Sequence, residues 1–292
     1  MTTIGLIGFG EAGASIAGGL VEAGVEVVAT DVRLASDAGG ALRAQADDLG
    51  VVLVEDAASV AGRCQVILSF VTSSAAIPVA ESLAPHLGGE HLVVDANSTS
   101  PARVQEVGRT LEGSGAAVCD VAVMSAVPPH RHRVPMLASG PGAQRFVDLE
   151  AGFNVRLVEG GMGAASAIKM LRSSLIKGLE ALLLEFGLAA RTFGATGEVL
   201  RSITGTLPSE DWEELMGYLL TRTVKHAARR GHELEEVADM FRTSGVEPLV
   251  ASAAARRLLA AGELDVADQV PDGETGYDQL LEIIAAAGEE PR

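Results

Sequence analysis

Three polar side chains on one long apolar helix are the first residues in this sequence whose spacing could support chemistry. Lys169, Ser173 and Lys177 follow one another at four-residue steps, so they form a polar stripe, and Arg172 lies beside it. Neighbouring cations and partial burial both lower the pKa of a lysine from about 10.4 toward neutral pH. A lysine tuned in this way accepts a proton from an alcohol while a hydride leaves the alcohol carbon. The alternative interpretation is a solvated helix face that carries several cations.

The helix that must position these side chains is predicted over residues 164–193. Its apolar residues recur at steps of three and four, which predicts a buried stripe made of Ile168, Leu171, Leu175, Leu179, Leu182 and Phe186. The helix follows Gly160-Gly161-Met162-Gly163, a segment suited to a hinge between two domains. A cleft between those domains would open near Lys169.

A glycine-rich turn near the N-terminus is suited to binding phosphate. An apolar run ends in Gly8-Phe9-Gly10-Glu11-Ala12-Gly13, which fits the pattern G-x-G-x-x-G. Gly8 permits a tight turn from strand to helix, Gly10 lets the backbone approach a pyrophosphate, and Gly13 allows close helix–strand packing. The helix that follows directs free N–H groups and its positive dipole end at the phosphates. The motif predicts dinucleotide binding by Gly8, Phe9, Gly10, Glu11, Ala12 and Gly13; the alternative is a glycine turn in another doubly wound sheet.

The next apolar run ends at an acidic residue where the ribose of a dinucleotide would lie. Val25–Thr30 is followed by Asp31, roughly 20 residues past the glycines. A carboxylate there accepts hydrogen bonds from the ribose hydroxyls and repels a 2′-phosphate, so Asp31 favours NAD. Arg33 is a second candidate, because an arginine near this place binds the 2′-phosphate of NADP. We expect NAD as the cofactor and keep NADP as the alternative.

Strands alternate with helices through the first part of the chain, which is typical of a parallel sheet covered on both faces. Further strands are predicted at residues 51–54, 65–71, 91–96, 116–121, 134–140 and 154–158. Ligands of such sheets lie beyond the carboxyl ends of the strands. Val71 and Thr72 lie at the carboxyl end of the fourth strand and Asn97 follows the fifth, so these three residues are candidate cofactor contacts. Thr72 could equally cap the helix that comes next.

From Gly163 onward the pattern changes, and no segment predicts a strand. Helices are expected at residues 164–193, 195–205, 209–230, 232–245, 247–262 and 276–287. A chain of 292 residues also suggests two domains. The predicted fold class is therefore α/β: an N-terminal Rossmann domain with a doubly wound parallel sheet at residues 1–160, then an all-helical domain at residues 161–292 for substrate and dimer contacts.

Composition narrows the class of protein. The formal net charge of −17 disfavours a nucleic-acid partner, whose phosphates would be repelled. The two cysteines, Cys64 and Cys119, lie in or beside apolar segments, which predicts buried free thiols and no metal site. No signal peptide and no uncharged apolar run of about 18 residues is visible, so we expect a cytoplasmic protein with no membrane partner.

Motifs in a fixed order carry a resemblance to a known family. Ile4–Gly13 is similar to that family's cofactor signature, and Asp120–Ser125 resembles its substrate-binding segment D-A-P-V-S-G-G. Gly163–Lys169 resembles the segment that carries the family's catalytic lysine. From end to end the chain resembles the 6-phosphogluconate dehydrogenase-like, or β-hydroxyacid dehydrogenase, superfamily, which includes 3-hydroxyisobutyrate dehydrogenase and tartronate semialdehyde reductase. The resemblance implies that Lys169 is the general acid/base for oxidation of a hydroxyl β to a carboxylate, followed by decarboxylation in some members, and that the helical domain packs across a homodimer.

Departures from the family pattern concern the substrate. Ser173 stands where relatives usually have Asn, and Met124-Ser125-Ala126-Val127 follows the sixth strand in place of S-G-G. The late segment 221–237 resembles a subgroup whose C-terminal domain has no known function. The resemblance therefore supports the family's fold and cofactor for this chain better than it supports the substrate of any named relative. The candidate substrate residues in these segments are Met124, Ser125, Ala126 and Ser173.

Two basic segments leave alternatives open. His130-Arg131-His132-Arg133 is either an exposed turn or a site for a substrate carboxylate or phosphate, which makes His130 and Arg133 further candidate substrate residues. Its His-x-His spacing has no carboxylate or cysteine beside it, so we expect no metal. His226 lies among cations on a helix, either on a solvated or subunit-facing surface or in contact with substrate.

The predicted function is an NAD(P)-dependent oxidoreductase that acts on a small, anionic 3-hydroxy acid. One alternative is an imine reductase-like enzyme, which Lys169 disfavours because such relatives generally lack the lysine. Another is a protein without enzymatic activity that senses the redox state of the cofactor.

Overall fold

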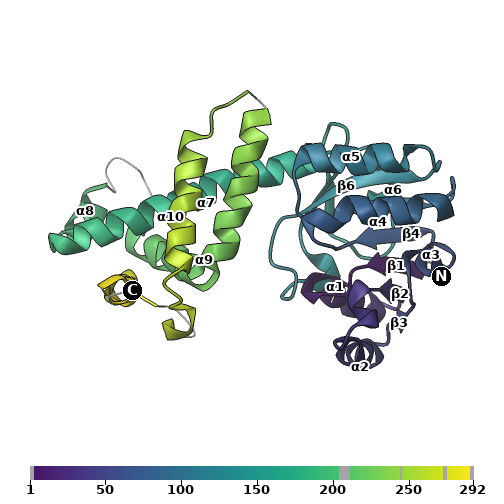
Figure 1. The fold of residues 1–292 in the computed structure, drawn as a ribbon, viewed down its shortest axis with the longest axis horizontal. Coiled ribbons are helices and arrows are strands. Elements are labelled where there is room, and N and C mark those ends of the chain that lie inside the picture. The colour runs from purple at the N-terminus through teal and green to yellow at the C-terminus, as the bar shows by residue number, and fades with distance from the viewer. Residues whose placement is uncertain (1–2, 204–210, 244, 272–274, 290–292) are drawn as a thin grey trace. The chain divides into compact units, whose positions relative to one another are not determined.

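The computed structural model describes residues 3–203, 211–243, 245–271 and 275–289. It divides into two compact units, Met1–Met170 and Leu171–Arg292 (Figure 1). The sequence placed the hinge at residues 160–163, whereas the first turns of the long helix at residues 164–170 pack with the sheet and so belong to the first unit.

The first unit is built on a single eight-stranded sheet. Its spatial order is β3-β2-β1-β4-β5-β6-β7-β8, in which β1 to β6 run parallel, β7 runs antiparallel to β6, and β8 runs parallel to β7. The strands are β1 (Thr3–Ile7), β2 (Glu26–Thr30), β3 (Val52–Leu53), β4 (Val66–Ser69), β5 (Leu92–Asp95), β6 (Ala117–Val123), β7 (Met136–Ser139) and β8 (Val155–Leu157). The predicted doubly wound sheet is confirmed. Each predicted strand is present, and most of the strands are shorter than predicted.

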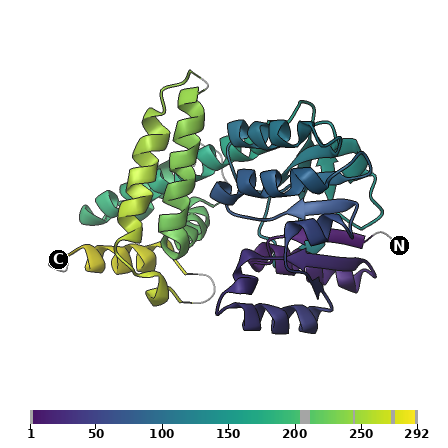
Figure 2. The ribbon, with the colours of Figure 1, turned by 45° about the vertical axis from the view of Figure 1, so that its right-hand side comes forward.

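Helices cover both faces of this sheet (Figure 2). One face packs against α1 (Glu11–Glu22), α2 (Gly39–Leu49) and α6 (Ala143–Val147), and the other packs against α3 (Ala57–Ala61), α4 (Ala76–Leu83) and α5 (Pro101–Glu112). Leu6 faces the first group and its neighbour Ile7 faces the second, which is why the central strands are apolar at consecutive positions. Short 3₁₀ turns include η1 (Val32–Ala35), η2 (Ser73–Ala75), η3 (Ala84–His86) and η4 (Arg131–Arg133).

The strand order reverses at β1, which has β2 on one side and β4 on the other. Ligands of doubly wound sheets bind at such a switch point, beyond the carboxyl ends of the strands. Gly8 follows β1 with a φ of +97°, and a Cβ at this residue would lie 2.3 Å from the carbonyl oxygen of Phe70, which follows β4. Only glycine fits this turn, so the sequence motif and the topology identify the same place.

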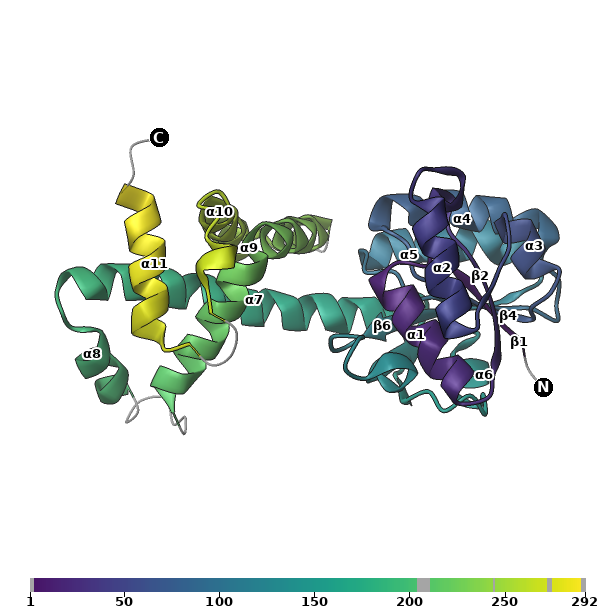
Figure 3. The same cartoon turned by 90° about the horizontal axis from the view of Figure 1, so that it is seen from below.

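The second unit is helical in the residues that the structure describes (Figure 3). Its helices are the remainder of α7 (Ala164–Thr192), then α8 (Thr196–Ile203), α9 (Trp212–Thr243), α10 (Leu249–Gly262) and α11 (Tyr277–Glu289), with a short turn η5 (Ala267–Gln269). Leu184, Leu220 and Leu280 lie at the centre of its separate apolar core. Parts of three predicted helices, at residues 204–205, 209–210 and 244, lie outside the described residues.

One predicted helix boundary was wrong. The sequence predicted a break near Gly231, but α9 continues through it and is kinked instead at His226, whose φ and ψ are −138° and 22°. Gly231 serves packing, because a Cβ there would lie 2.6 Å from Cγ of Leu259 on α10. A glycine inside a helix can thus mark close helix–helix contact and not an end.

The predicted buried stripe of α7 was also wrong in part. Leu179 and Phe186 pack against the core of the second unit, as expected. Leu175 is 73% exposed and Leu182 is 62% exposed. Ile168 and Leu171, which belong to the same predicted stripe, are exposed too. α7 therefore has one apolar face that this chain covers and another that it leaves open.

No helix in the described ranges combines the length and apolar character needed to cross a bilayer.

Candidate functional site

The turn from β1 into α1 forms a cradle for an anion. Gly10 is the N-cap of α1 and offers no capping side chain, so the first backbone N–H groups of the helix are directed at the crevice. A Cβ at Gly10 would have only Nη2 of Arg33 within 4 Å, at 3.8 Å, which leaves space for a ligand beside the backbone. A Cβ at Gly13 would lie 2.1 Å from the carbonyl oxygen of Gly8, so this glycine serves helix packing. The cradle fits the pyrophosphate of a dinucleotide.

Not every residue of the glycine motif presents its side chain to a ligand. The side chain of Phe9 is buried in the core of the first unit, so this residue can contribute only backbone. Glu11 is exposed and Ala12 is half-buried at the start of α1. The motif would act mainly through its main chain.

Asp31 and Arg33 form a tight pair at the end of β2. Oδ1 of Asp31 accepts hydrogen bonds from Nε of Arg33 at 2.8 Å and from the Arg33 backbone N–H at 2.9 Å. Oδ2 accepts from Nη2 of Arg33 and from the Phe9 backbone N–H, both at 2.8 Å. The hydrogen bond from the Arg33 side chain is the main reason that the pKa of Asp31 is lowered to about 2. Asp31 is therefore a carboxylate whose two oxygens are both engaged before a ribose arrives.

The segments after β4 and β5 are joined by an asparagine. Oδ1 of Asn97 accepts from the Val71 backbone N–H at 2.6 Å, and Nδ2 of Asn97 donates to Oγ of Ser69 at 3.1 Å. Asn97 is buried, so it braces the end of β4 from β5 and fixes the position of Val71. Thr72 lies exposed beside Val71 and makes no side-chain cap to the following turn. These residues lie on the same edge of the sheet as the glycine turn, as predicted.

Lys169 reaches this edge from the second turn of α7. Its Nζ donates to Oγ of Ser98 at 2.7 Å, and Ser98 lies three residues beyond the end of β5. Ser98 is exposed and Lys169 is half-buried, so the two polar groups are accessible at the carboxyl edge of the sheet. Met124, Ser125 and Ala126 directly follow β6 at the same edge. The structure thus gathers the predicted lysine with the candidate residues that follow the strands.

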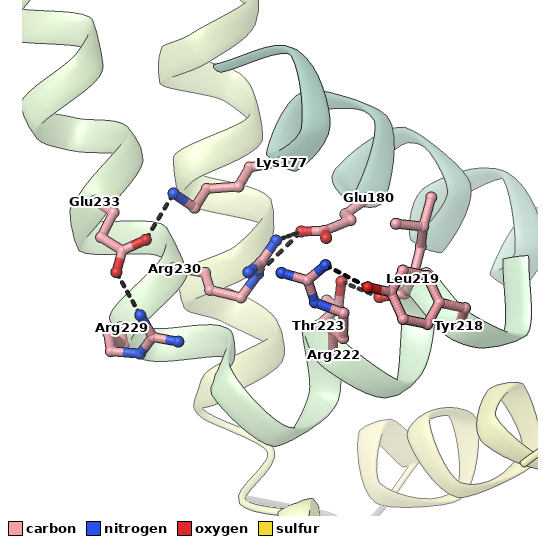
Figure 4. A network of polar contacts seen from close by, with 9 residues as sticks. All are labelled: Lys177, Glu180, Tyr218, Leu219, Arg222, Thr223, Arg229, Arg230 and Glu233. Carbon is pink, nitrogen blue, oxygen red and sulfur yellow. Dashed lines mark hydrogen bonds and ion pairs between the residues drawn. The ribbon is translucent and has the colours of Figure 1, made fainter. Parts of the chain in front are cut away.

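Lys177 does not act as a free neighbouring cation of Lys169. Its Nζ forms an ion pair of 2.6 Å with Glu233, and the side chain is buried in the second unit. Arg230 pairs with the fully buried Glu180, and the exposed Arg229 pairs with Glu233, so α7 and α9 are joined by ion pairs that are only partly buried (Figure 4). The sequence argument that Lys177 would tune Lys169 is weakened, because the charge of Lys177 is compensated by Glu233.

Two other predicted contacts are placed as follows. Ser173 is half-buried one turn beyond Lys169 on α7. His226 is exposed at the kink of α9, and partial desolvation of the ring, together with the nearby Arg229, lowers its pKa. Nothing in this placement assigns either side chain a substrate.

The basic turn at residues 130–133 lies elsewhere in the first unit. Arg131 forms an ion pair with Glu22, and buried His132 packs beside Gly19, both near the C-terminal end of α1. A helix of 12 residues puts that end about 16 Å from the glycine turn along the axis. His130 and Arg133 are exposed on this turn. The structure does not gather them with Lys169, so their predicted role in substrate binding gains no structural support.

Two buried carboxylates lie side by side on neighbouring strands, and the sequence analysis named only Asp120, as the first residue of the segment that resembles a substrate-binding motif. Asp95 of β5 and Asp120 of β6 are partners in the sheet register, and both are almost fully buried. Burial, together with the nearby Asp120, raises the pKa of Asp95 to about 6. The available signal was an acidic residue inside each of two otherwise apolar strands, which is costly unless the carboxylate has partners.

The described residues hold no group of three or more His, Cys, Asp or Glu side chains that could bind a metal. Cys64 and Cys119 are buried free thiols, as predicted. Burial raises the pKa of Cys64 to about 11, which leaves this thiol unreactive at neutral pH.

The glycine cradle, the acid at the end of β2 and the strand order define the class: a Rossmann-type protein with an NAD(P)-binding domain. Residues 3–145 match the NAD binding domain of 6-phosphogluconate dehydrogenase, and residues 190–260 match a domain of unknown function, DUF1932. The chain belongs to the 6-phosphogluconate dehydrogenase-like family, in the subgroup that carries this second domain.

Solved structures extend the similarity over the whole chain. A conserved hypothetical protein from Sinorhizobium meliloti 1021 is 37% identical, with a TM-score of 0.85 over 98% of this chain and 97% of its own. The conserved protein MTH1747, described as structurally similar to 3-hydroxyacid dehydrogenases, is 31% identical, with a TM-score of 0.77 over 89% of this chain and 97% of its own. The 3-hydroxyisobutyrate dehydrogenase of Mycobacterium tuberculosis shares the fold at 19% identity, with a TM-score of 0.75 over 98% of this chain and 99% of its own.

Proposed function

We propose that this protein is a nicotinamide-dependent oxidoreductase that interconverts a small anionic 3-hydroxy acid and its carbonyl form, with Lys169 as the general acid/base. The observation that carries the proposal is the position of Lys169, whose Nζ lies 2.7 Å from Oγ of Ser98 at the edge of the sheet that holds the glycine cradle. Membership of a dehydrogenase family supports the reaction class.

Each of the gathered groups has a task in this reaction. The glycine turn and the N-terminus of α1 hold the pyrophosphate, and Asp31 holds the adenosine ribose. A bound nicotinamide supplies the hydride acceptor. The neutral amine of Lys169 takes the hydroxyl proton of the substrate as its C–H bond gives up the hydride, and it returns a proton in the reverse direction. Ser98 orients the amine, while Ser125 and Ser173 are the proposed substrate contacts.

We propose NAD as the preferred cofactor, since Asp31 places a negative charge where NADP carries its 2′-phosphate. Arg33 opposes this preference, because its guanidinium lies against both Asp31 oxygens. Calorimetric titration of the purified protein with NADH and NADPH measures the outcome directly. Tighter NADH binding supports the role of Asp31, and tighter NADPH binding assigns the dominant role to Arg33.

The assignment of Lys169 is tested by Lys169→Met, which keeps the length of the side chain and removes its basic group. We expect NADH affinity within twofold of the parent and turnover lower by a factor of at least about 10², since loss of a general base costs roughly 10²–10⁴. A panel of 3-hydroxy acids and amines with cofactor absorbance as readout supplies the substrate. Arg63→Met, at an exposed cation that precedes β4 and so lies at the opposite edge of the sheet, is the control and should retain turnover.

Unchanged turnover in Lys169→Met would remove this lysine from the mechanism. Turnover of imines alone would assign the protein to the imine reductases. Cofactor binding with no turnover of any substrate would favour a redox sensor.

We further propose that the protein is a homodimer in which the open apolar face of α7 meets its counterpart on a second copy. Ile168, Leu171, Leu175 and Leu182 follow the 3-4-3-4 spacing of a helix–helix seam, with Gly178 filling the remaining position. A Cβ at Gly178 would meet nothing within 4 Å, so this position is open to close approach by another helix. An identical antiparallel α7 is complementary to this pattern, because a two-fold axis near Gly178 places the leucines on either side against one another.

A further inference from the structure

The start of α7 is capped by side chains of the sheet and not by its own preceding residues. The chain before α7 is Gly160-Gly161-Met162-Gly163, in which the glycines have no side chain to bind the first backbone N–H groups. Gly163 has a φ of +95°, and a Cβ there would lie 2.9 Å from the Pro101 carbonyl oxygen, so a capping residue cannot replace it. The Ala164 N–H bonds to the Gly161 carbonyl oxygen at 3.2 Å, but the N–H groups of Ala165 and Ser166 must find acceptors elsewhere.

Asp120 and Ser139 supply those acceptors from neighbouring strands. Oδ2 of Asp120 accepts from the Ser166 backbone N–H at 2.9 Å, and Oδ1 accepts from the Ser166 hydroxyl at 2.6 Å. Oγ of Ser139 accepts from the Ala165 backbone N–H at 3.0 Å and donates to Oδ2 of Asp120 at 3.2 Å. We call these four residues, Asp120, Ser139, Ala165 and Ser166, the α7 clamp.

The hydrogen bonds of the clamp are buried, and the sheet fixes the positions of their acceptors. Asp120, Ser139 and Ala165 are fully buried, and Ser166 is nearly so, which shields the hydrogen bonds from water. Asp120 and Ser139 are register partners on β6 and β7, so the sheet fixes their relative positions. A carboxylate that accepts several hydrogen bonds at a helix N-terminus also interacts favourably with the helix dipole.

Lys169 lies three residues after Ser166, which is less than one helical turn or about 4.5 Å along the axis. Its Nζ is held at the other end by Ser98, beyond β5. β5 and β6 are adjacent, with Asp95 opposite Asp120. Neighbouring strands of one sheet therefore hold both ends of the lysine. The clamp holds the helix turn that carries its backbone, and Ser98 holds its amine.

We propose that Asp120 is the positioning residue for Lys169, which it holds in place by clamping the first turn of α7 to β6. This inference rests on the proposed function in so far as it concerns catalysis. Loss of the clamp would let the first turn of α7 fray, and the amine would then occupy its productive position for a smaller fraction of the time.

The test uses the full-length protein carrying Asp120→Asn, which keeps the shape but places an NH₂ group against donors of α7. Hydrogen exchange followed by mass spectrometry needs no substrate, and we expect exchange at residues 164–170 to accelerate at least tenfold. Asp56→Asn is the matched control, because Asp56 caps α3 through Ser59 and has no contact with the clamp. The control should leave exchange at residues 164–170 unchanged, and α3 keeps its cap because the amide oxygen of asparagine can still accept from Ser59.

Kinetics separate positioning from general support of the fold. In Asp120→Asn we expect kcat to fall at least tenfold while the KM for the cofactor stays within twofold, and Asp56→Asn should change neither. Ser166→Ala removes one clamp bond and should give a smaller loss, which Ser166→Thr should restore because threonine keeps the hydroxyl. If Asp120→Asn does not fold, the Ser166 pair carries the test.

Unchanged exchange at residues 164–170 in Asp120→Asn, or in Ser166→Ala when that variant carries the test, would overturn the clamp. Accelerated exchange with unchanged kcat would overturn its role in positioning Lys169. A failure of the proposed function is recognised separately, because Lys169→Met would then retain turnover whatever the exchange data show.

Discussion

Arg33 closes over the carboxylate of Asp31, so these two residues have to be considered as a pair in cofactor binding. A ribose hydroxyl can share an oxygen of Asp31 with Arg33 or displace the guanidinium, which is about half exposed and free to swing outward. A 2′-phosphate would instead attract the guanidinium away from Asp31. The cofactor preference therefore depends on how strongly Arg33 prefers its carboxylate partner.

Replacing Arg33 by alanine shows which effect dominates. The variant Arg33→Ala removes the guanidinium from both Asp31 oxygens, which keep only their backbone partners, and leaves an unneutralised charge beside the 2′ position. We expect the ratio of the Kd for NADPH to the Kd for NADH to rise at least tenfold, or about 1.4 kcal/mol. Arg43→Ala is the control. Arg43 lies on the neighbouring α2 and donates one long hydrogen bond, to the carbonyl oxygen of Leu34. An equal loss of affinity for NADH and NADPH would mean that Arg33 only supports the conformation of Asp31.

Residues close together in sequence were the ones that the sequence could assign. The glycines of the turn and Asp31 lie within one β-α-β segment, where each residue type has a defined local task. Lys169 needed a resemblance, because many helices carry lysines at similar spacing. Asp120, Ser139 and Ser166 could not be grouped at all, since only the pairing of β6 with β7 and the docking of α7 bring them together.

At the scale of single elements, α7 shows what helical periodicity does and does not predict. The three- and four-residue steps correctly mark apolar faces, but they do not identify what covers each face. Leu179 and Phe186 meet the core of the second unit, while Leu175 and Leu182 do not. The kink of α9 at His226 is a comparable case, because no proline or glycine at that position marks it in the sequence.

The open face of α7 gives a prediction about assembly. Leu175→Glu places a charge in the middle of the proposed seam, and we expect the mass measured by light scattering to fall from that of a dimer to that of a monomer at micromolar concentration. Val32→Glu makes the same chemical change at a 93% exposed valine of the first unit and should leave the mass unchanged. A dimer that persists in Leu175→Glu would place the interface elsewhere.

At the scale of the whole molecule, the two units have separate apolar cores and share one helix. The residues of the cofactor cradle all belong to the first unit. The single tryptophan of the chain, Trp212, begins α9 in the second unit. Cofactor binding and tryptophan fluorescence therefore report on different units.

This separation predicts how cofactor affects unfolding. NADH at one hundred times its Kd should stabilise the first unit by about 2.7 kcal/mol and shift the corresponding calorimetric transition upward. The thermal transition followed by Trp212 fluorescence should shift by less than 1 °C. Equal shifts in both signals would mean that the two units unfold as one cooperative body.

The placement of Lys169 before the boundary at Met170 also bears on how such proteins diversify. The proposed proton-transfer group, its serine partner and the cofactor cradle are encoded in one contiguous stretch of the gene. Mutations beyond that stretch can accumulate, and whole segments can be exchanged by recombination, without disturbing the groups that handle proton and hydride. Selection for a new substrate can then act on the rest of the chain while the inherited chemistry is retained.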